Sequence, residues 1–65
     1  MKPLTQREIE ILAYLTDGMT NDAIAEALYV SKDTVKMYLK NIFHKLEVDN
    51  RVSAAVKAVR NNIIR

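Results

Sequence analysis

The 65-residue sequence has no cysteine, one histidine, one glycine and one proline. The absence of cysteine excludes disulfides and thiolate metal sites, and a single histidine, His44, cannot build a histidine metal site. No apolar run approaches the roughly 18 residues of a membrane span, and no signal peptide opens the chain. We therefore expect a soluble binding domain in the cytoplasm, with no metal, no other cofactor and no membrane contact.

An enzyme is not expected, because no pair of acidic or nucleophilic side chains is spaced for catalysis. Glu8 and Glu10 are two residues apart, so on a helix they do not share a face. What the sequence has is 49% hydrophobic residues, with helix-forming Ala, Leu, Ile, Glu and Lys between its few turn residues. This composition predicts one all-α domain over residues 1–65, with a thin core.

The first helix is predicted over residues 6–17. Thr5 and Glu8 have the spacing of a capping box, in which each side chain accepts a hydrogen bond from the other residue's backbone N–H. Gly18 follows as a stop, because glycine adopts a left-handed conformation without steric cost. The predicted buried stripe is Ile9, Leu12 and Leu15, flanked by Ile11 and Ala13.

Three more helices are predicted, over residues 21–28, 32–46 and 50–61. Thr20, Ser31 and Asn50 are suitable caps at their starts. At 100° per residue, one side of the third helix is apolar and is formed by Val35, Leu39, Ile42 and Leu46. The opposite side carries Lys36, Met37, Lys40 and His44.

Positive charge is concentrated in the second half of the chain. Residues 1–30 have a net charge of −3, residues 31–46 of +3 and residues 47–65 of +2. A short helix, a three-residue turn and a longer helix with a basic outward face is a helix-turn-helix arrangement. Its outward side chains are placed to enter a DNA major groove, where lysine donates to guanine and methionine packs on a thymine methyl group. The same charge also suits an ordinary solvated surface.

Three separated segments, LTQREIEIL, DGMTNDAIAEALYVSKDTVKMYLKNIFHKL and DNRVSAAV, resemble the LuxR/FixJ-type (GerE-like) helix-turn-helix domain. The resemblance covers about residues 4–59. It implies a four-helix transcription regulator, or the output domain of one, that binds double-stranded DNA as a homodimer through its fourth helix. RNA polymerase is a further candidate partner.

Specific roles follow from the resemblance. The family's base-reading residues fall on Lys36, Met37 and Lys40. Its contacts to the DNA backbone fall on Thr20, Asn21, Ser31, Thr34, Tyr38, Asn41 and Lys45. Its dimer contacts fall on the fourth helix, where the candidates are Val52, Ala55, Val56 and Val59.

Several positions depart from the family pattern. Ala23 stands where a glutamate commonly completes a second capping box, so the cap of the second helix is expected to be weaker. Tyr29 and Glu47 stand where glycine is frequent, and a left-handed backbone at Tyr29 would be strained. Tyr38 replaces a frequent histidine. None of these changes removes a base-reading residue.

Two questions stay open from the sequence. The fourth helix has more apolar residues than one core face needs, so its outer residues are either a dimer surface or part of the monomer core. The function also has two alternatives, a sigma-factor-like promoter-reading domain and a small helical adaptor whose basic face binds an acidic protein. The N-R-x-x-A-A stretch at residues 50–55 favours the LuxR-type reading.

Overall fold

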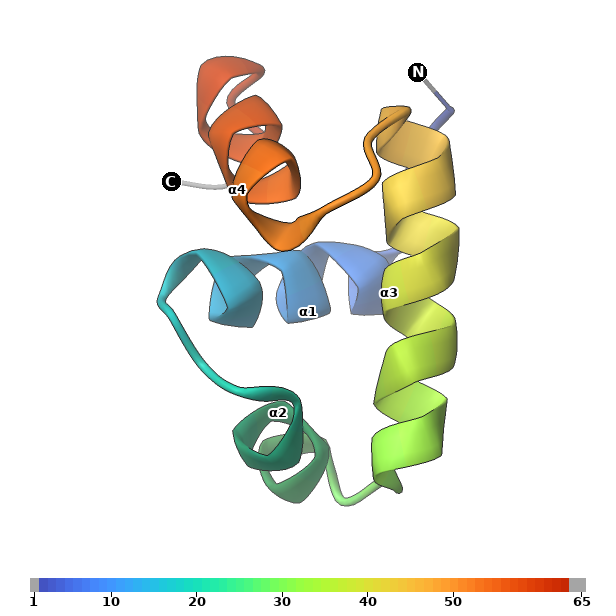
Figure 1. The fold of residues 1–65 in the computed structure, drawn as a ribbon. Coiled ribbons are helices and arrows are strands. Elements are labelled where there is room, and N and C mark those ends of the chain that lie inside the picture. Colours follow the sequence, from blue (N-terminus) through green and yellow to red (C-terminus); the bar gives the residue numbers. More distant parts are fainter. Residues whose placement is uncertain (1, 64–65) are drawn as a thin grey trace.

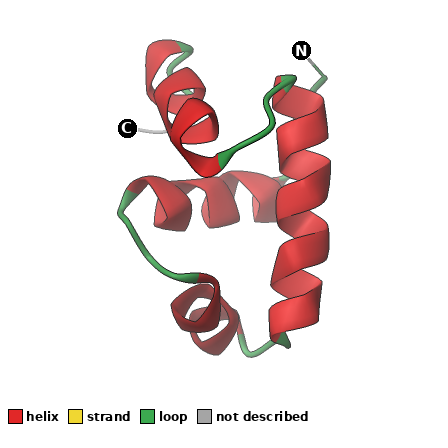
Figure 2. Cartoon of the chain, viewed as in Figure 1, coloured by secondary structure: helices red, strands yellow, loops and turns green. Residues whose placement is uncertain are grey.

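The computed structural model describes residues 2–63, which form four helices and no strand (Figures 1 and 2). The helices are α1 (Gln6–Thr16), α2 (Asn21–Leu28), α3 (Lys32–Leu46) and α4 (Arg51–Arg60). Helix α1 lies between α2 and α4, and the long α3 packs against all three (Figure 1). The predicted all-α fold with four helices is confirmed.

The predicted helix bounds agree with the structure to within one residue. Helices α2 and α3 have the predicted bounds, whereas α1 ends at Thr16 and not at residue 17. The range 50–61 is one residue too long at each end of α4, because Asn50 and Asn61 are caps with non-helical backbone angles. Arg65, which contributed to the predicted basic charge of the last segment, lies outside the described residues.

Each helix begins at a polar residue whose side chain accepts a hydrogen bond from the backbone N–H three residues later. These residues are Thr5, Thr20, Ser31 and Asn50. The capping box at α1 is complete, since the Thr5 N–H also donates to Glu8 Oε1 at 2.8 Å. At α2, Ala23 cannot complete such a box, but the Thr20 hydroxyl still accepts from the Ala23 N–H at 3.1 Å. All four helix starts are therefore fixed by local hydrogen bonds.

The four helices also end in the same way, in a Schellman turn. A residue with positive φ donates its N–H to the carbonyl three residues earlier, and the next residue donates to the carbonyl five residues earlier. The positive-φ residues are Gly18, Tyr29, Glu47 and Asn62. Each is followed by a hydrophobic residue packed against the core, namely Met19, Val30, Val48 and Ile63. Only one of these turns has the glycine that the sequence pattern favours.

The core is formed by one side of each helix. The apolar side predicted for α3 is confirmed, since Val35, Leu39, Ile42 and Leu46 are all buried. In α1 the buried apolar residues are Ile11, Leu12 and Leu15, whereas Ile9 is half-buried, so the prediction that Ile9 belongs to the buried stripe is wrong. Because α1 packs against all three other helices, it buries a wider sector than a single narrow stripe.

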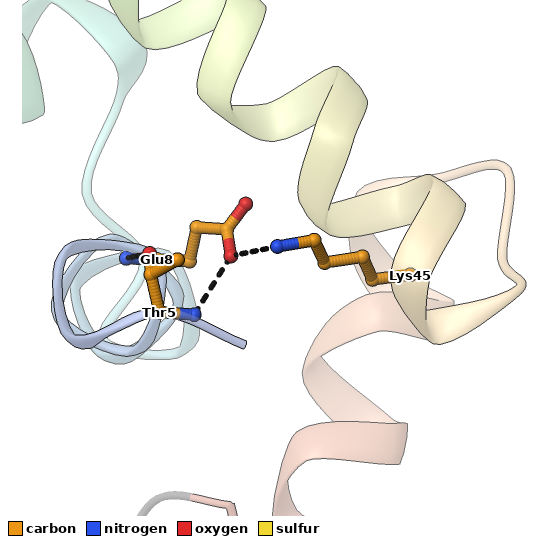
Figure 3. A network of polar contacts seen from close by, with 3 residues as sticks. All are labelled: Thr5, Glu8 and Lys45. Carbon is orange, nitrogen blue, oxygen red and sulfur yellow. Dashed lines mark hydrogen bonds and ion pairs between the residues drawn. The ribbon is translucent and has the colours of Figure 1, made fainter. Parts of the chain in front are cut away.

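An ion pair joins the start of α1 to the end of α3 (Figure 3). Lys45 Nζ lies 2.6 Å from Glu8 Oε1, and the Glu8 side chain is almost completely buried. Burial raises the pKa of the Glu8 carboxyl, but the hydrogen bonds and charge of Lys45 and the hydrogen bonds of Thr5 outweigh it, so the pKa is lowered overall. The pair fixes the last turn of α3 against α1.

Candidate nucleic-acid interface

The outward side of α3 carries the three residues predicted to read bases. Lys36 and Lys40 are exposed, and Met37 is 55% exposed although it is a large apolar side chain. They lie outside the sector formed by the four buried residues of the same helix, so the core holds the backbone of α3 while these side chains stay in solvent. Over its 15 residues α3 is about 22 Å long. A helix of this shape fits a major groove about 12 Å wide.

The starts of α2 and α3 supply the polar residues beside that face. Thr20 and Ser31 are exposed residues, and the hydroxyl of each caps its helix. Ser31 Oγ also lies 2.9 Å from Thr34 Oγ1, so the two hydroxyls at the start of α3 are hydrogen-bonded to each other. Helix starts present N–H groups without intrahelical partners, which suits them to binding phosphate.

A shallow groove connects α3 to the starts of α2 and α4. It is lined by Asn21, Lys36, Leu39, Lys40, Phe43 and Arg51. The structure therefore brings one predicted backbone-contacting residue, Asn21, to the same groove as two of the predicted base-reading residues. The groove has an apolar floor and a cationic rim, because Leu39 is buried and both lysines are exposed.

The other predicted backbone-contacting residues differ in exposure. Asn41 is exposed on α3, and Tyr38 is half-buried and packs against the core. Lys45 lies at the far end of α3, where its ammonium donates to Glu8. Since an ammonium has three N–H donors, this hydrogen bond uses only one of them. His44 is exposed, as the sequence predicted.

Ion pairs near this face are exposed. Lys32, at the start of α3, lies 3.5 Å from Asp22 of α2, and both side chains are largely in solvent. Exposed pairs of this kind contribute little to stability and are screened by salt. The pair adds no net charge at this end of α3, so the cationic character of the face comes from Lys36 and Lys40.

Helix α4 has an apolar outward side. Val52, Val56 and Val59 are 73%, 47% and 61% exposed, whereas Ala54 and Ala58 are fully buried. The fourth candidate of the predicted dimer surface, Ala55, is half-buried against the core. The outer valines are therefore not buried in the monomer core.

Sequence reasoning missed two contacts because each joins residues far apart in the chain. At Arg51 the sequence indicates only a positive charge and a motif position, whereas the guanidinium donates to Asn21 Oδ1 at 2.7 Å and to the Met19 carbonyl at 2.8 Å. Glu8 was explained by the capping box alone, and its ion pair with Lys45 spans 37 positions. No periodic pattern in one sequence signals such partners.

Within residues 2–63, no helix combines the length and the hydropathy needed to cross a bilayer. The same residues contain no cluster of three or more His, Cys, Asp or Glu side chains that could hold a metal ion.

Comparison with known proteins gives a consistent result. Residues 2–58 match the family of bacterial regulatory proteins known as the luxR family. The chain is 44% identical over 62 residues to the transcriptional regulatory protein DegU of Brevibacillus brevis, covering 95% of this chain and 26% of DegU. It is 46% identical over 61 residues to the transcriptional regulatory protein LiaR of Bacillus subtilis, covering 94% of this chain and 29% of LiaR.

A solved structure shows the same fold. The response regulator ChrA of a heme-sensing two-component system superposes with a TM-score of 0.93 and 42% sequence identity. The match covers 98% of this chain and 32% of ChrA. The chain thus spans about a quarter to a third of the length of the relatives it matches.

Proposed function

The chain belongs to the luxR family of bacterial regulatory proteins, and from this premise we propose that it is a sequence-specific DNA-binding domain that regulates transcription. It acts as a regulator or as the output domain of one, with residues 1–65 forming a single domain. Its ligand is double-stranded DNA, it works in the cytoplasm, and it needs no cofactor, metal or catalytic group. RNA polymerase is a further partner in this proposal.

In the proposed complex α3 lies in the major groove. Lys36 and Lys40 donate to base edges, and Met37 packs against a thymine methyl group. What supports these roles is their exposure on α3, whose buried Val35 and Leu39 hold the helix in the core.

Contacts to phosphates hold α3 in register but do not read sequence. We assign them to Thr20, Asn21, Ser31, Thr34, Tyr38, Asn41 and Lys45. The exposed caps at Thr20 and Ser31 support this assignment, because both lie at helix starts where backbone N–H groups point outward. Lys45 would contribute while it remains paired with Glu8.

A homodimer forms on DNA through α4 in the same proposal. The exposed valines 52, 56 and 59 recur at intervals of four and three residues, so they form one apolar stripe, with Ala55 at its edge. Two copies related by a two-fold axis would bury this stripe against itself and place two α3 helices on paired half-sites.

The observation that carries the proposal is the exposed Lys36–Met37–Lys40 face of α3 in a luxR-family fold. The test is selection of random-core duplexes with the purified chain at two salt concentrations, followed by sequencing. We expect enrichment of a motif with two-fold symmetry, and its loss in Lys36→Ala or Lys40→Ala. Arg7→Ala is the matched control, because it removes one exposed positive charge from α1, outside this face.

A different outcome would point to the adaptor alternative. If binding collapses with salt and no motif is enriched, the attraction to DNA is only electrostatic. The basic face would then be a surface for an acidic protein, and the proposed function would be wrong.

A further inference from the structure

Arg51 is a half-buried arginine that the proposed function does not use. It is the first residue of α4, and both of its terminal nitrogens donate hydrogen bonds to the region around the start of α2. Nη1 donates to Asn21 Oδ1 at 2.7 Å, and Nη2 donates to the Met19 carbonyl at 2.8 Å. A planar guanidinium making two such bonds is held in one orientation.

These hydrogen bonds cross a gap in the packing of the helices. Within residues 2–63, α2 and α4 are the one pair of helices that do not pack against each other, and α1 lies between them (Figure 1). The side chain of Arg51 reaches past that gap to the residues before and at the start of α2. It is therefore a direct link between the apolar α4 stripe and the polar start of α2.

The link also determines the orientation of the Asn21 amide. A guanidinium has only donors, so the atom facing it must be the carbonyl oxygen of Asn21 and not the nitrogen. The two N–H donors of Nδ2 then lie on the other side of the same planar group, and none of the described residues accepts from them. Asn21 and Arg51 line the groove that also contains Lys36 and Lys40.

We propose that Arg51 is a positioning residue for DNA binding, which holds the carbonyl side of the Asn21 amide so that its Nδ2 donates to a DNA phosphate. This inference rests on the proposed function. It adds that a residue of α4 controls a phosphate contact made by α2.

The experiment compares two charge-conserving variants, Arg51→Lys and Arg7→Lys, on the duplex selected by the wild-type chain. Lysine keeps the charge at position 51 but cannot make both hydrogen bonds in the same geometry. Arg7 is exposed and pairs with Glu10 on its own helix, so it serves as the control. We expect Arg51→Lys to weaken binding about fivefold, as for the loss of one hydrogen bond, and Arg7→Lys to bind like the wild type.

A second measurement separates positioning from a structural role. Arg51→Lys is repeated in an Asn21→Ala background, where we expect no additional loss of affinity because the positioned amide is gone. The NMR signals of the Asn21 side-chain amide in the free protein should shift in Arg51→Lys and not in Arg7→Lys. Thermal unfolding of each variant accompanies the binding data.

Three results would overturn the inference. The first is equal DNA affinity of Arg51→Lys and the wild type. The second is an equal loss of DNA affinity on Arg51→Lys with and without the Asn21 side chain, which would indicate that Arg51 itself contacts DNA or only supports the fold. An unchanged Asn21 amide signal would contradict the positioning. Failure of the wild-type chain to select any duplex would instead contradict the proposed function, and the inference with it.

Discussion

Helices α3 and α4 pack into the same core, yet they differ in both of their sides. Helix α3 buries large residues, Val35, Leu39, Ile42 and Leu46, whereas α4 buries only the alanines Ala54 and Ala58. In solvent, by contrast, α3 presents charged lysines, whereas α4 presents three apolar valines. An exposed apolar stripe on a small domain indicates a surface that another molecule covers.

The difference shows that amphipathicity alone does not identify the outward side of a helix. In α4 the small residues face inward, which lets its backbone lie close to α1, and the larger apolar residues remain in solvent. In α3 the usual pattern holds, with charged residues outside. This difference matches the two partners of the proposed function, a polyanion at α3 and a second copy of this chain at α4.

The largest expected effect comes from removing the charge of α3. A Lys36→Ala/Lys40→Ala double variant should lose at least about thirtyfold in affinity for its selected duplex, since each base contact contributes about 1–3 kcal/mol. Both side chains are exposed, so the thermal unfolding midpoint should change little. Fluorescence anisotropy over a salt series measures the loss. A DNA affinity within tenfold of the wild type would show that Lys36 and Lys40 of α3 do not make the proposed base contacts.

The attachment of α3 to α1 gives the next largest effect. Glu8→Gln removes the charge that pairs with Lys45 and should lower the free energy of unfolding by about 2 kcal/mol. Glu10→Gln is the control, because the exposed Glu10–Arg7 pair contributes little. Denaturant titration followed by circular dichroism measures both variants.

The same pair predicts a dependence on pH. The pKa of Glu8 is lower in the folded chain than its ordinary value of 4.5, so its ionised form stabilises the fold above that pH. As the pH falls through the folded-state pKa, this contribution is lost. The stability difference between the wild type and Glu8→Gln should therefore narrow below about pH 4.5. A difference that is constant from neutral to acidic pH would show that the charge of Glu8 does not matter.

Local chemistry explains how much of this fold the sequence predicts. The Thr5–Glu8 capping box and the buried side of α3 depend on residues within one or a few turns, and both are confirmed. The three Schellman turns without glycine form because the hydrophobic residue that follows each of them packs against the core. No local sequence pattern specifies that packing. The left-handed backbone at Tyr29 is predicted only through the family resemblance.

The candidate site divides in the same way. The exposed face of α3 follows from angular spacing, because a helix that buries one sector must expose the opposite one. Arg51 and Asn21 are 30 positions apart, and Glu8 and Lys45 are 37 apart. Such contacts depend on how the helices cross, which the pattern within any one helix does not determine.

A smaller effect is expected at the outer stripe of α4. Val52 is 73% exposed in the first turn, where an acidic residue suits the helix dipole, so Val52→Glu should fold normally. Two such charges facing each other across a two-fold axis should reduce affinity for a paired site about tenfold, with little change for a single half-site.

Val52→Lys is the matched variant with the opposite charge. Val52→Lys should also bind the paired site less tightly than the wild type does, because the α4 stripe is no longer apolar. Analytical ultracentrifugation with and without DNA gives the number of copies bound. One copy of the wild-type chain on a full symmetric site would exclude a dimer through α4.

The smallest expected effect lies at the turns after α2 and α4. Tyr29 has φ 57° and is 96% exposed, so it carries the cost of a left-handed backbone without burying its ring. Tyr29→Gly should raise the free energy of unfolding by about 0.5–1 kcal/mol, the strain relieved less the added entropy of glycine in the unfolded chain.

Asn62 provides the comparison, because its φ is 55° and asparagine tolerates this conformation better than other residues. The free energy of unfolding should therefore rise less in Asn62→Gly than in Tyr29→Gly, although both residues lie in helix-ending turns with the same hydrogen-bond pattern. Urea denaturation of the two variants side by side gives the difference. If Tyr29→Gly is less stable than the wild type, the exposed ring contributes to the fold in a way that outweighs its backbone strain, and the turn leading into α3 would be stabilised by its tyrosine.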